Sequence, residues 1–349
     1  MYCIAHNILS PIGNTSEENL RAILSGESAL RLYSNHFADV EPFCASMFSE
    51  QPNFVDLCVS SAKQALAHCQ VDASDDRTIF ILSSTKGDNL DLLTPAQQIA
   101  AYFHNPNAPI VVSNACISGV SAQITAARLL SSNLYDNAVV IGCDVLSKFI
   151  VSGFQSFKAL SPEPCRSFDA DRIGLNLGEA AATMVWTNNR PAMQPVWQYV
   201  TGSIHNDANH ISGPSRTGEG AFLCLSDILS VVPSSQIGLL SVHGTATLYN
   251  DEMESIALHR AGLCDVPIAV FKGYYGHTLG AAGILETILS MLLIEQGMLI
   301  GNPRYVHCGT TYALNISAEN RRLPSSTNTF IKMLSGFGGC NAAACFRYC

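Results

Sequence analysis

The sequence predicts an α/β fold in which helices pack on the faces of mixed or parallel sheets. Short apolar runs rich in β-branched residues alternate with helical patterns along most of the 349 residues. The predicted strands are residues 78–84, 109–113, 137–142, 237–242 and 267–271, and the predicted helices are residues 56–69, 117–131, 251–263 and 281–297. The C-terminal segment NTFIKMLSGFGGCNAAACFRYC differs, because it is typical of two strands joined by a glycine-rich turn.

Composition excludes several classes of protein. Hydrophobic residues make up 48% of the chain and charged residues 13%, which is enough for a large core and too little charge for general disorder. The net charge of −9 argues against a nucleic-acid binder. The 13 cysteines are an odd number, and the N-terminal sequence lacks the pattern of a signal peptide. Free thiols in a cytoplasmic, reducing compartment are therefore expected.

Two further features bear on membranes, metals and domains. The most apolar stretch, residues 281–301, is interrupted by Glu286 and Glu295, which favours a buried helix over a membrane span. The C-terminal cysteines fit no common zinc spacing, so no metal site is expected. Proline and polar residues gather at 188–195, which suggests two halves, residues 1–187 and 188–349, although no internal repeat is evident.

The sharpest local motif surrounds Cys116, in PIVVSNACISGVSAQITAARLL. A predicted buried strand ends at Ser113, and a helix begins just beyond the cysteine. A thiol at a helix N-terminus lies at the positive end of the peptide dipoles, which predicts a lowered pKa and a nucleophilic thiolate. A structural core cysteine explains the same pattern about equally well, because free cysteines are commonly buried.

Two later strands each lead to a histidine. In the segment VHGTAT, His243 is followed by Thr245 and Thr247, whose alternation lets both hydroxyl groups face one groove. In the segment FKGYYGHTLGAAG, His277 follows Lys272 and precedes small residues that allow close approach of a backbone or a substrate. Each histidine, taken alone, is also compatible with a structural role.

The fourth motif is SGFGGCNAAACF, where glycines surround Phe337. A turn of this kind can aim backbone N–H groups at a bound oxygen, as an oxyanion hole requires. A plain hairpin turn is the alternative, and the motif by itself favours that interpretation.

Taken in order, these motifs resemble those of the β-ketoacyl-acyl carrier protein synthases of the thiolase superfamily. The matching segments are ACISG, HGTAT, KGYYGHTLGAAG and GFGGCN, together with RSFDADRIGLNLGEAA at 166–181 and SPIGNTSEENLRAILSGES near the N-terminus. The resemblance spans nearly the whole chain. It implies a thiolase-like, duplicated five-layer α-β-α-β-α fold and the elongating, Cys-His-His class of synthase.

The resemblance also implies a role for each matching residue. Cys116 would accept an acyl group, while His243 and His277 would promote loss of CO₂ from a malonyl unit. The resemblance further implies that Lys272 supports the histidines, that Phe337 contributes an oxyanion N–H and an aromatic gate, that Thr245 and Thr247 hold the pantetheine arm, and that Asp251 and Glu286 are supporting acids.

The same resemblance implies cofactors and partners. No permanently bound cofactor is expected, because the 4′-phosphopantetheine arrives on an acyl carrier protein. A homodimer, or a heterodimer with another ketosynthase-like chain, is expected, with no nucleic acid and no membrane span.

Departures from the family pattern leave alternatives open. The chain is shorter than the elongating synthases that it resembles, and the stretches after residue 89 and from 186 to 236 look compressed. A chain-length-factor-like partner of another ketosynthase is therefore a second interpretation, although such partners often lack the nucleophile that Cys116 supplies. Initiating synthases and thiolases fit less well, because GHTLGAAG around His277 is typical of the elongating class.

Overall fold

The protein is described here by a computed structural model, which covers residues 1–192 and 195–349. Up to residue 192 its elements are β1 (Tyr2–Leu9), α1 (Ser16–Leu24), β2 (Arg31–Tyr33), β3 (Phe43–Ser46), α2 (Phe54–Leu66), β4 (Thr78–Ser83), α3 (Leu93–Tyr102), β5 (Ile110–Val112), α4 (Ser118–Ser131), β6 (Asn137–Asp144), α5 (Lys148–Ser156), β7 (Leu177–Gly178) and β8 (Ala180–Thr187). From residue 195 onward they are β9 (Trp197–Asn206), α6 (Glu219–Leu229), β10 (Leu239–Ser241), α7 (Leu248–Arg260), β11 (Ile268–Ala269), α8 (Lys272–Tyr275), α9 (Ala282–Glu295), β12 (Met298–Leu299), β13 (Arg321–Arg322), β14 (Thr329–Gly336) and β15 (Cys340–Tyr348), with short 3₁₀ turns at Ser234–Gln236 and Leu279–Ala281.

The main sheet has ten strands in the order β11-β10-β14-β15-β9-β1-β8-β6-β4-β5. Its two halves repeat one topology. In the first half β4 is parallel to β5 and β6, and β8 and β1 follow in antiparallel pairs. In the second half β10 is parallel to β11 and β14, and β15 and β9 follow in antiparallel pairs. Numbered in chain order, the strands of each half lie in the order 3-2-4-5-1, so the fold is duplicated although the sequence shows no repeat.

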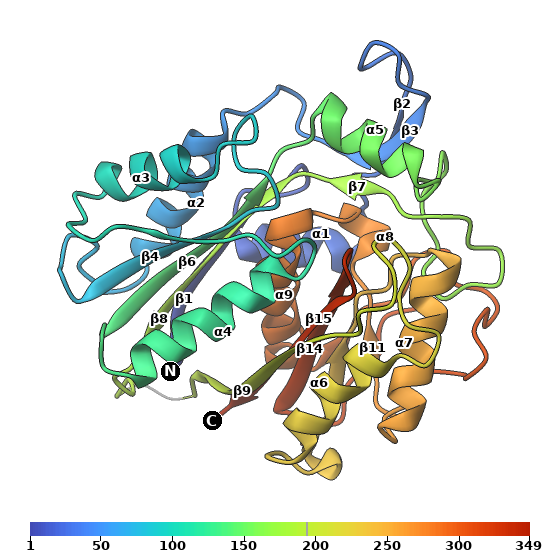
Figure 1. Ribbon diagram of the computed structural model, residues 1–349. Helices are drawn as coiled ribbons and strands as arrows, with labels where there is room; N and C mark the ends of the chain where they lie inside the picture. Colours follow the sequence, from blue (N-terminus) through green and yellow to red (C-terminus); the bar gives the residue numbers. More distant parts are fainter. Residues whose placement is uncertain (193–194) are drawn as a thin grey trace.

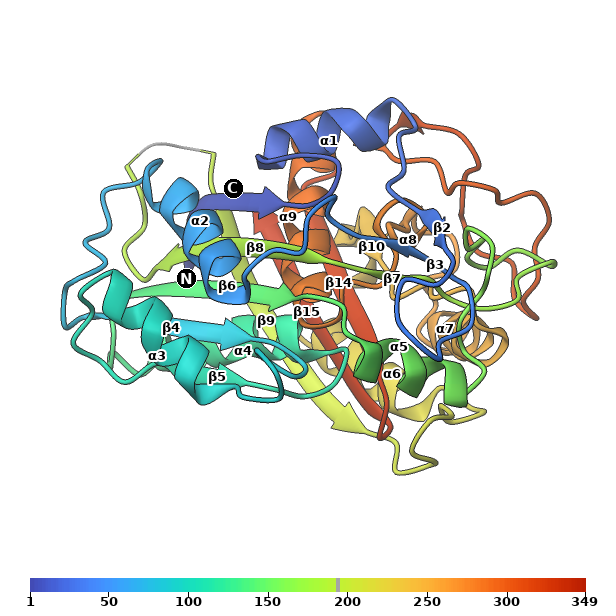
Figure 2. The ribbon, with the colours of Figure 1, turned by 90° about the horizontal axis from the view of Figure 1, so that it is seen from above.

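Helices separate and cover the two half-sheets in five layers (Figure 1). The helix α2 packs on β1, β6 and β8, and α6 packs on β9 and β15. Between the half-sheets lie α4 and α9, which contact each other and strands of both halves. The half-sheets join at β1 and β9, which pair through Tyr2 and Cys3. Figure 2 shows the two half-sheets from above. The thiolase-like α/β fold expected from the sequence is confirmed.

The two central helices owe their position to their composition. Nearly every residue of α9 is buried, and its apolar side chains belong to the largest core cluster. Close packing against α4 requires small residues, because a Cβ on Gly283 would lie 2.5 Å from the backbone nitrogen of Val120. The apolar stretch at 281–301 is therefore a core helix, and no helix among the described residues is long and apolar enough to cross a membrane.

All the predicted elements are present, most of them with shifted bounds. The predicted strand at 267–271 shrinks to β11, and the short helix α8 separates it from His277. The structure adds elements that periodicity did not reveal, above all β1, β8 and β9 at the centre of the sheet. The last strand of the first half-sheet, β8, ends at Thr187, and the first strand of the second, β9, begins at Trp197. The exact division into residues 1–187 and 188–349 stays a prediction. Residues 193 and 194 of the proline-containing segment 188–195 lie outside the described residues.

The prediction that the cysteines are free thiols is confirmed for the described residues, since none of the 13 is in a disulfide.

Candidate active site

A sharp turn between β5 and α4 places Cys116 at the start of the central layer. Ala115 adopts a left-handed backbone with a φ of 45°, which a residue with a Cβ adopts at some energetic cost. The hydroxyl of Ser118 stabilises this turn by accepting from the N–H of Asn114 at 2.7 Å and donating to the carbonyl of Ala115 at 2.6 Å. The turn presents the buried thiol of Cys116 to a cavity.

The loop between β10 and α7 positions His243 through a buried carboxylate. Both oxygens of Glu254 on α7 accept backbone N–H groups, from His243 and from Gly244, each at 2.7 Å. Asp251, one turn earlier, accepts the N–H groups of Phe168 at 2.7 Å and Ala246 at 3.1 Å. These acids fix the backbone that carries the histidine, and the sequence analysis did not identify Glu254.

The segment between α8 and α9 positions His277 in one defined tautomer. Its Nδ1 accepts the backbone N–H of Leu279 at 3.3 Å, which leaves the proton of the neutral ring on Nε2. The N–H of Gly280, one residue further, donates to the buried carboxylate of Asp144 at 2.7 Å. Asp144 ends β6, so it connects the histidine segment to the first half-sheet; sequence reasoning did not single it out.

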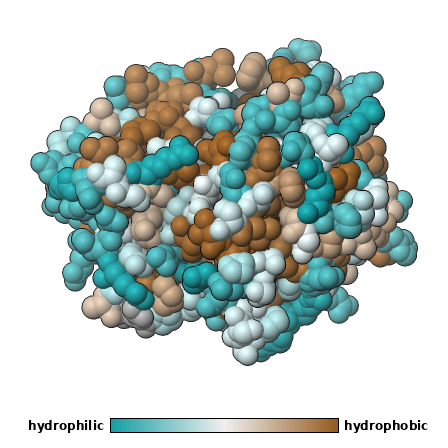
Figure 3. Space-filling model, turned by 60° about the horizontal axis from the view of Figure 1, so that its bottom comes forward, coloured by the Kyte–Doolittle hydropathy of each residue, from teal (hydrophilic) through white to brown (hydrophobic). Residues whose placement is uncertain are grey.

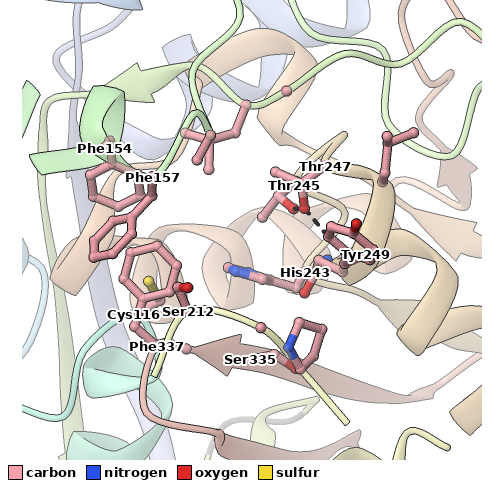
Figure 4. Close-up of a pocket in the computed structure, with 18 of the residues that line it drawn as sticks. Cys116, Phe154, Phe157, Ser212, His243, Thr245, Thr247, Tyr249, Ser335 and Phe337 are labelled. Carbon is pink, nitrogen blue, oxygen red and sulfur yellow. Dashed lines mark hydrogen bonds between the residues drawn. The ribbon is translucent and has the colours of Figure 1, made fainter. Parts of the chain in front are cut away.

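Cys116, His243 and His277 meet in one place, as the sequence predicted. The thiol sulfur and one nitrogen of each ring lie within 4.8 Å of one another. The two rings are nearly perpendicular, at 85°, with centroids 5.0 Å apart. Figure 4 shows His243 pointing across the cavity toward Cys116 and Phe337. Within the described part of the chain, Nδ1 of His243 and Nε2 of His277 are buried without a hydrogen-bond partner.

Electrostatics at the site differ from the sequence-based prediction for the thiol. Burial raises the pKa of Cys116 to about 11, although the charge of Lys272 and the backbone N–H of Phe337 act in the opposite direction. The predicted lowering by the helix N-terminus is therefore wrong, because desolvation of the thiolate is the larger effect. Burial and the neighbouring lysines hold the pKa values of His243 and His277 well below their usual range, so both rings are neutral at pH 7.

The cavity in front of the thiol has a volume of about 390 Å³. Its wall beside Cys116 is aromatic: the ring of Phe337 packs on Phe154 at 5.3 Å and on Phe157 at 5.1 Å between centroids. The opposite wall carries Thr245 and Thr247, whose hydroxyl oxygens are 3.0 Å apart (Figure 4). The cavity therefore offers an apolar surface at the nucleophile and hydroxyl groups facing it.

Two lysines share one carboxylate behind the histidines. The ammonium of Lys272 donates to Oε1 of Glu286 at 2.7 Å, and that of Lys332 donates to Oε2 of the same residue. All three side chains are at most 2% exposed. Lys272 and Glu286, which the sequence analysis selected, do not line the cavity, so they act on the histidines from behind. Lys332 was missed, because a lysine inside a predicted strand carries no motif.

The Cys-His-His cluster is a poor site for a resident metal ion. Its ligand atoms are close enough for metal binding, and neutral imidazoles are metal ligands. A thiol must however lose its proton to bind a metal, which the raised pKa of Cys116 opposes. The positive charges of Lys272 and Lys332 also lower the pKa of both histidines, because they oppose a further positive charge at this place. The cluster suits a nucleophile with two hydrogen-bond donors instead.

Comparison with known proteins agrees with this geometry. Two family models match, "Beta-ketoacyl synthase, N-terminal domain" over residues 54–192 and "Beta-ketoacyl synthase, C-terminal domain" over residues 199–305. The chain is 25% identical to 3-oxoacyl-[acyl-carrier-protein] synthase 2 of Vibrio cholerae over 97% of both chains. It is 29% identical to a mitochondrial putative 3-oxoacyl-[acyl-carrier-protein] synthase of Schizosaccharomyces pombe, where the match spans 67% of this chain and 60% of that protein.

Solved structures show the same fold. A chain of the complex between a ketosynthase and its chain length factor from Xenorhabdus doucetiae superposes with a TM-score of 0.88 at 25% identity, covering 100% of this chain and 98% of that one. A β-ketoacyl synthase from Burkholderia phymatum superposes with a TM-score of 0.89 at 22% identity, covering 100% and 99%. With both domain models matched in order and the fold shared, the chain belongs to the β-ketoacyl synthase family of the thiolase superfamily.

Proposed function

We propose that the protein is a β-ketoacyl-acyl carrier protein synthase, an acyltransferase that elongates an acyl chain by decarboxylative condensation. The observation that carries this proposal is the convergence of one thiol and two neutral imidazoles within 4.8 Å at the end of a cavity. A chain that acted only as a partner would not need this convergence.

In the first half-reaction Cys116 is the nucleophile. Its sulfur attacks the carbonyl carbon of the incoming acyl thioester, and the bond from that carbon to the carrier's sulfur breaks. The backbone N–H groups of Cys116 and Phe337 both act on the Cys116 sulfur, which supports a role for them in stabilising the oxyanion formed beside it. With a thiol pKa of about 11, a neutral imidazole must accept the proton and pass it to the departing thiolate.

In the second half-reaction the histidines act on a malonyl thioester. The bond to the carboxylate breaks, CO₂ leaves, and the electron pair forms an enolate whose oxygen accepts N–H groups from His277 Nε2 and from His243. The enolate carbon then attacks the acyl carbonyl on Cys116. A carbon–carbon bond forms and the carbon–sulfur bond to Cys116 breaks. The released thiolate takes up a proton from solvent, because its original proton left with the carrier thiol in the first half-reaction. No permanently bound cofactor takes part in these steps.

The substrate arrives on an acyl carrier protein, so its 4′-phosphopantetheine arm must pass through the cavity. The hydroxyl groups of Thr245 and Thr247 on the cavity wall support a role in holding the amides of that arm. Thr247 also accepts the N–H of Asn250 as the N-cap of α7, so its hydroxyl is held in a fixed orientation.

We also propose that the chain forms a dimer, with itself or with another ketosynthase-like chain. Strand β5 ends the ten-stranded sheet, so one of its edges faces no other strand among the described residues, and an unpaired edge invites pairing with a second chain. Apolar residues gather in patches on the side of the first half-sheet, to the left in Figure 3. Light scattering measures the oligomeric state, and a stable, active monomer would contradict the proposal.

The decisive experiment supplies acyl-carrier and malonyl-carrier thioesters and measures CO₂ and the 3-oxoacyl product. Wild-type protein is expected to form product, and Cys116→Ala is expected to form none. If the wild type forms no product alone but changes the product length of a second ketosynthase, the chain is a chain-length-factor-like partner instead.

A further inference from the structure

We propose that Lys332 is a positioning residue for condensation, which holds His243 in place and keeps both active-site imidazoles neutral. The inference rests on the proposed function and adds to it a residue that lies outside every motif of the active site.

Lys332 joins two parts of the site that are far apart in the sequence. Its ammonium donates to the carbonyls of Ser241 at 3.3 Å and Val242 at 3.2 Å, the two residues that precede His243. It also donates to Oε2 of Glu286 on α9, the helix that begins just after His277. One side chain therefore fixes the end of β10 against the helix behind the second histidine.

The backbone register makes this connection short. Lys332 on β14 lies directly opposite Ser241 on β10 in a parallel pair. Its side chain is 0% exposed, and an ammonium without partners would be strongly disfavoured there. Lys332 has three donors, and the carboxylate and two carbonyls use all of them. Such complete use of a buried cation indicates a fixed geometry.

The charge of Lys332 also matters for the histidines. Lys272 and Lys332 share the single negative charge of Glu286, so this buried group carries an excess positive charge when both are protonated. That excess opposes a further positive charge on either imidazole, and both lysines lower the histidine pKa values. Among the described residues, the other ionisable groups packed around the histidines include Glu254 and Asp251 on α7, Asp144 on β6 and the thiol of Cys116.

Neutral imidazoles are what the proposed chemistry needs. In its neutral form His277 keeps the hydrogen bond from Leu279 on Nδ1 and directs its Nε2 proton into the site. A protonated His277 would carry a hydrogen on Nδ1 and lose that bond, and a protonated His243 could not accept the proton of Cys116. Burial holds the pKa of Lys332 itself down, to about 8, so the lysine is mainly charged near neutral pH.

Two variants separate the contributions of Lys332. Lys332→Met removes the charge and all donors, whereas Lys332→Gln removes the charge but keeps N–H donors for the two carbonyls. Phe330→Leu is the matched control, since Phe330 is also fully buried, two residues earlier on the same face of β14, and has no part in the charge network. Acyl loading, kcat and KM for the malonyl carrier, and the pH profile are measured for each protein.

In Lys332→Met, kcat is expected to fall at least about tenfold, because displacing reacting groups by about 1 Å can cost a hundredfold. KM should change little, because Lys332 does not line the cavity. Lys332→Gln is expected to recover part of kcat. In both variants the acidic limb of the pH profile should move to higher pH, because the positive charge that disfavours protonation of the histidines is gone. Phe330→Leu should lower the unfolding midpoint without moving that limb.

Nuclear magnetic resonance titration of the imidazoles provides a test that does not depend on activity. In wild-type protein, His243 and His277 should remain neutral below pH 6.5, and in Lys332→Gln both should titrate at higher pH. Unchanged titration together with unchanged kcat overturns the proposal. If neither lysine variant folds, a wild-type titration near pH 6.5 overturns it. A wild type without condensing activity contradicts the proposed function, whereas the titration still tests Lys332.

Discussion

Gly119 and Gly283 bring the N-terminal ends of the two central helices into contact: a Cβ on Gly119 would lie 2.8 Å from the Cα of Gly283. This contact sets the distance between α4, which follows Cys116, and α9, which follows His277. The distance between Cys116 and His277 therefore depends on two residues that have no side chains.

Gly119→Ala should destabilise the protein by about 1–3 kcal/mol, the usual range for overpacking a dense core. Gly153→Ala is the matched control, because Gly153 lies inside helix α5 with no atom within 4 Å of an added Cβ. That change should raise stability by about 0.5–1 kcal/mol, as replacing a helical glycine does. Urea denaturation measures the free energy of unfolding of both variants, and equal effects of the two changes would contradict the packing argument.

Acyl loading should occur on Cys116 alone among the 13 cysteines. Among the described residues, this is the only thiol that lines the cavity beside the two histidines. Peptide mapping after incubation with an acyl-carrier thioester should find the adduct on the peptide that contains Cys116. The control is Cys308→Ser, since Cys308 is an exposed thiol outside the cavity. Loading that survives in Cys116→Ala would rule out this nucleophile.

The sequence predicted the position of the nucleophile better than its acidity. A strand, a turn and a helix around Cys116 are local features, and the structure reproduces them. The pKa depends instead on how deeply the thiol is buried, with Gly336 at the end of β14 and the Phe337 turn packed against Cys116. A local pattern contains no information on that burial. The charge of Lys272 and the backbone N–H groups of Phe337 and Cys116 lower the pKa of the thiol, but desolvation outweighs them.

The residues that sequence reasoning missed share one property: their partners are distant in the chain. Lys332 meets Glu286 and the end of β10 only because β14 pairs with β10. Asp144 reaches Gly280 across 136 positions. The strand β8 was missed for another reason, because it is buried on both faces and shows no alternation of polar and apolar residues.

Loss of either histidine should impair decarboxylation. His243→Ala and His277→Ala should each lower CO₂ release by about a hundredfold or more, as removal of one oxyanion donor does. His205→Ala is the control, because His205 pairs with Asp227 at the surface and does not line the cavity. A histidine variant with near-normal CO₂ release would contradict the Cys-His-His mechanism.

Acyl loading should also depend on an imidazole, which differs from what a pre-formed thiolate would require. With a pKa of about 11, only about one thiol in ten thousand is ionised at pH 7. Loading should therefore fall in at least one of the variants His243→Ala and His277→Ala, and the defect should shrink as the pH rises toward 10. A loading rate in both variants equal to that of wild type at pH 7 would show that Cys116 is activated without a base.

Acidification should destabilise the protein partly through its two buried histidines. Both pKa values lie well below 6.5 in the folded state, so below pH 6.5 the unfolded chain binds protons that the folded chain does not, and stability falls as the pH falls. Each histidine contributes at most about 1.4 kcal/mol per pH unit. Because buried acids such as Glu254, with a pKa raised to about 7, act in the opposite sense, the measurement is a difference. The unfolding free energies of wild type and His277→Gln are compared at pH 7.5 and 5.5. The wild type should lose more stability over that interval, and parallel losses would mean that His277 is protonated as readily in the folded protein as in the unfolded chain.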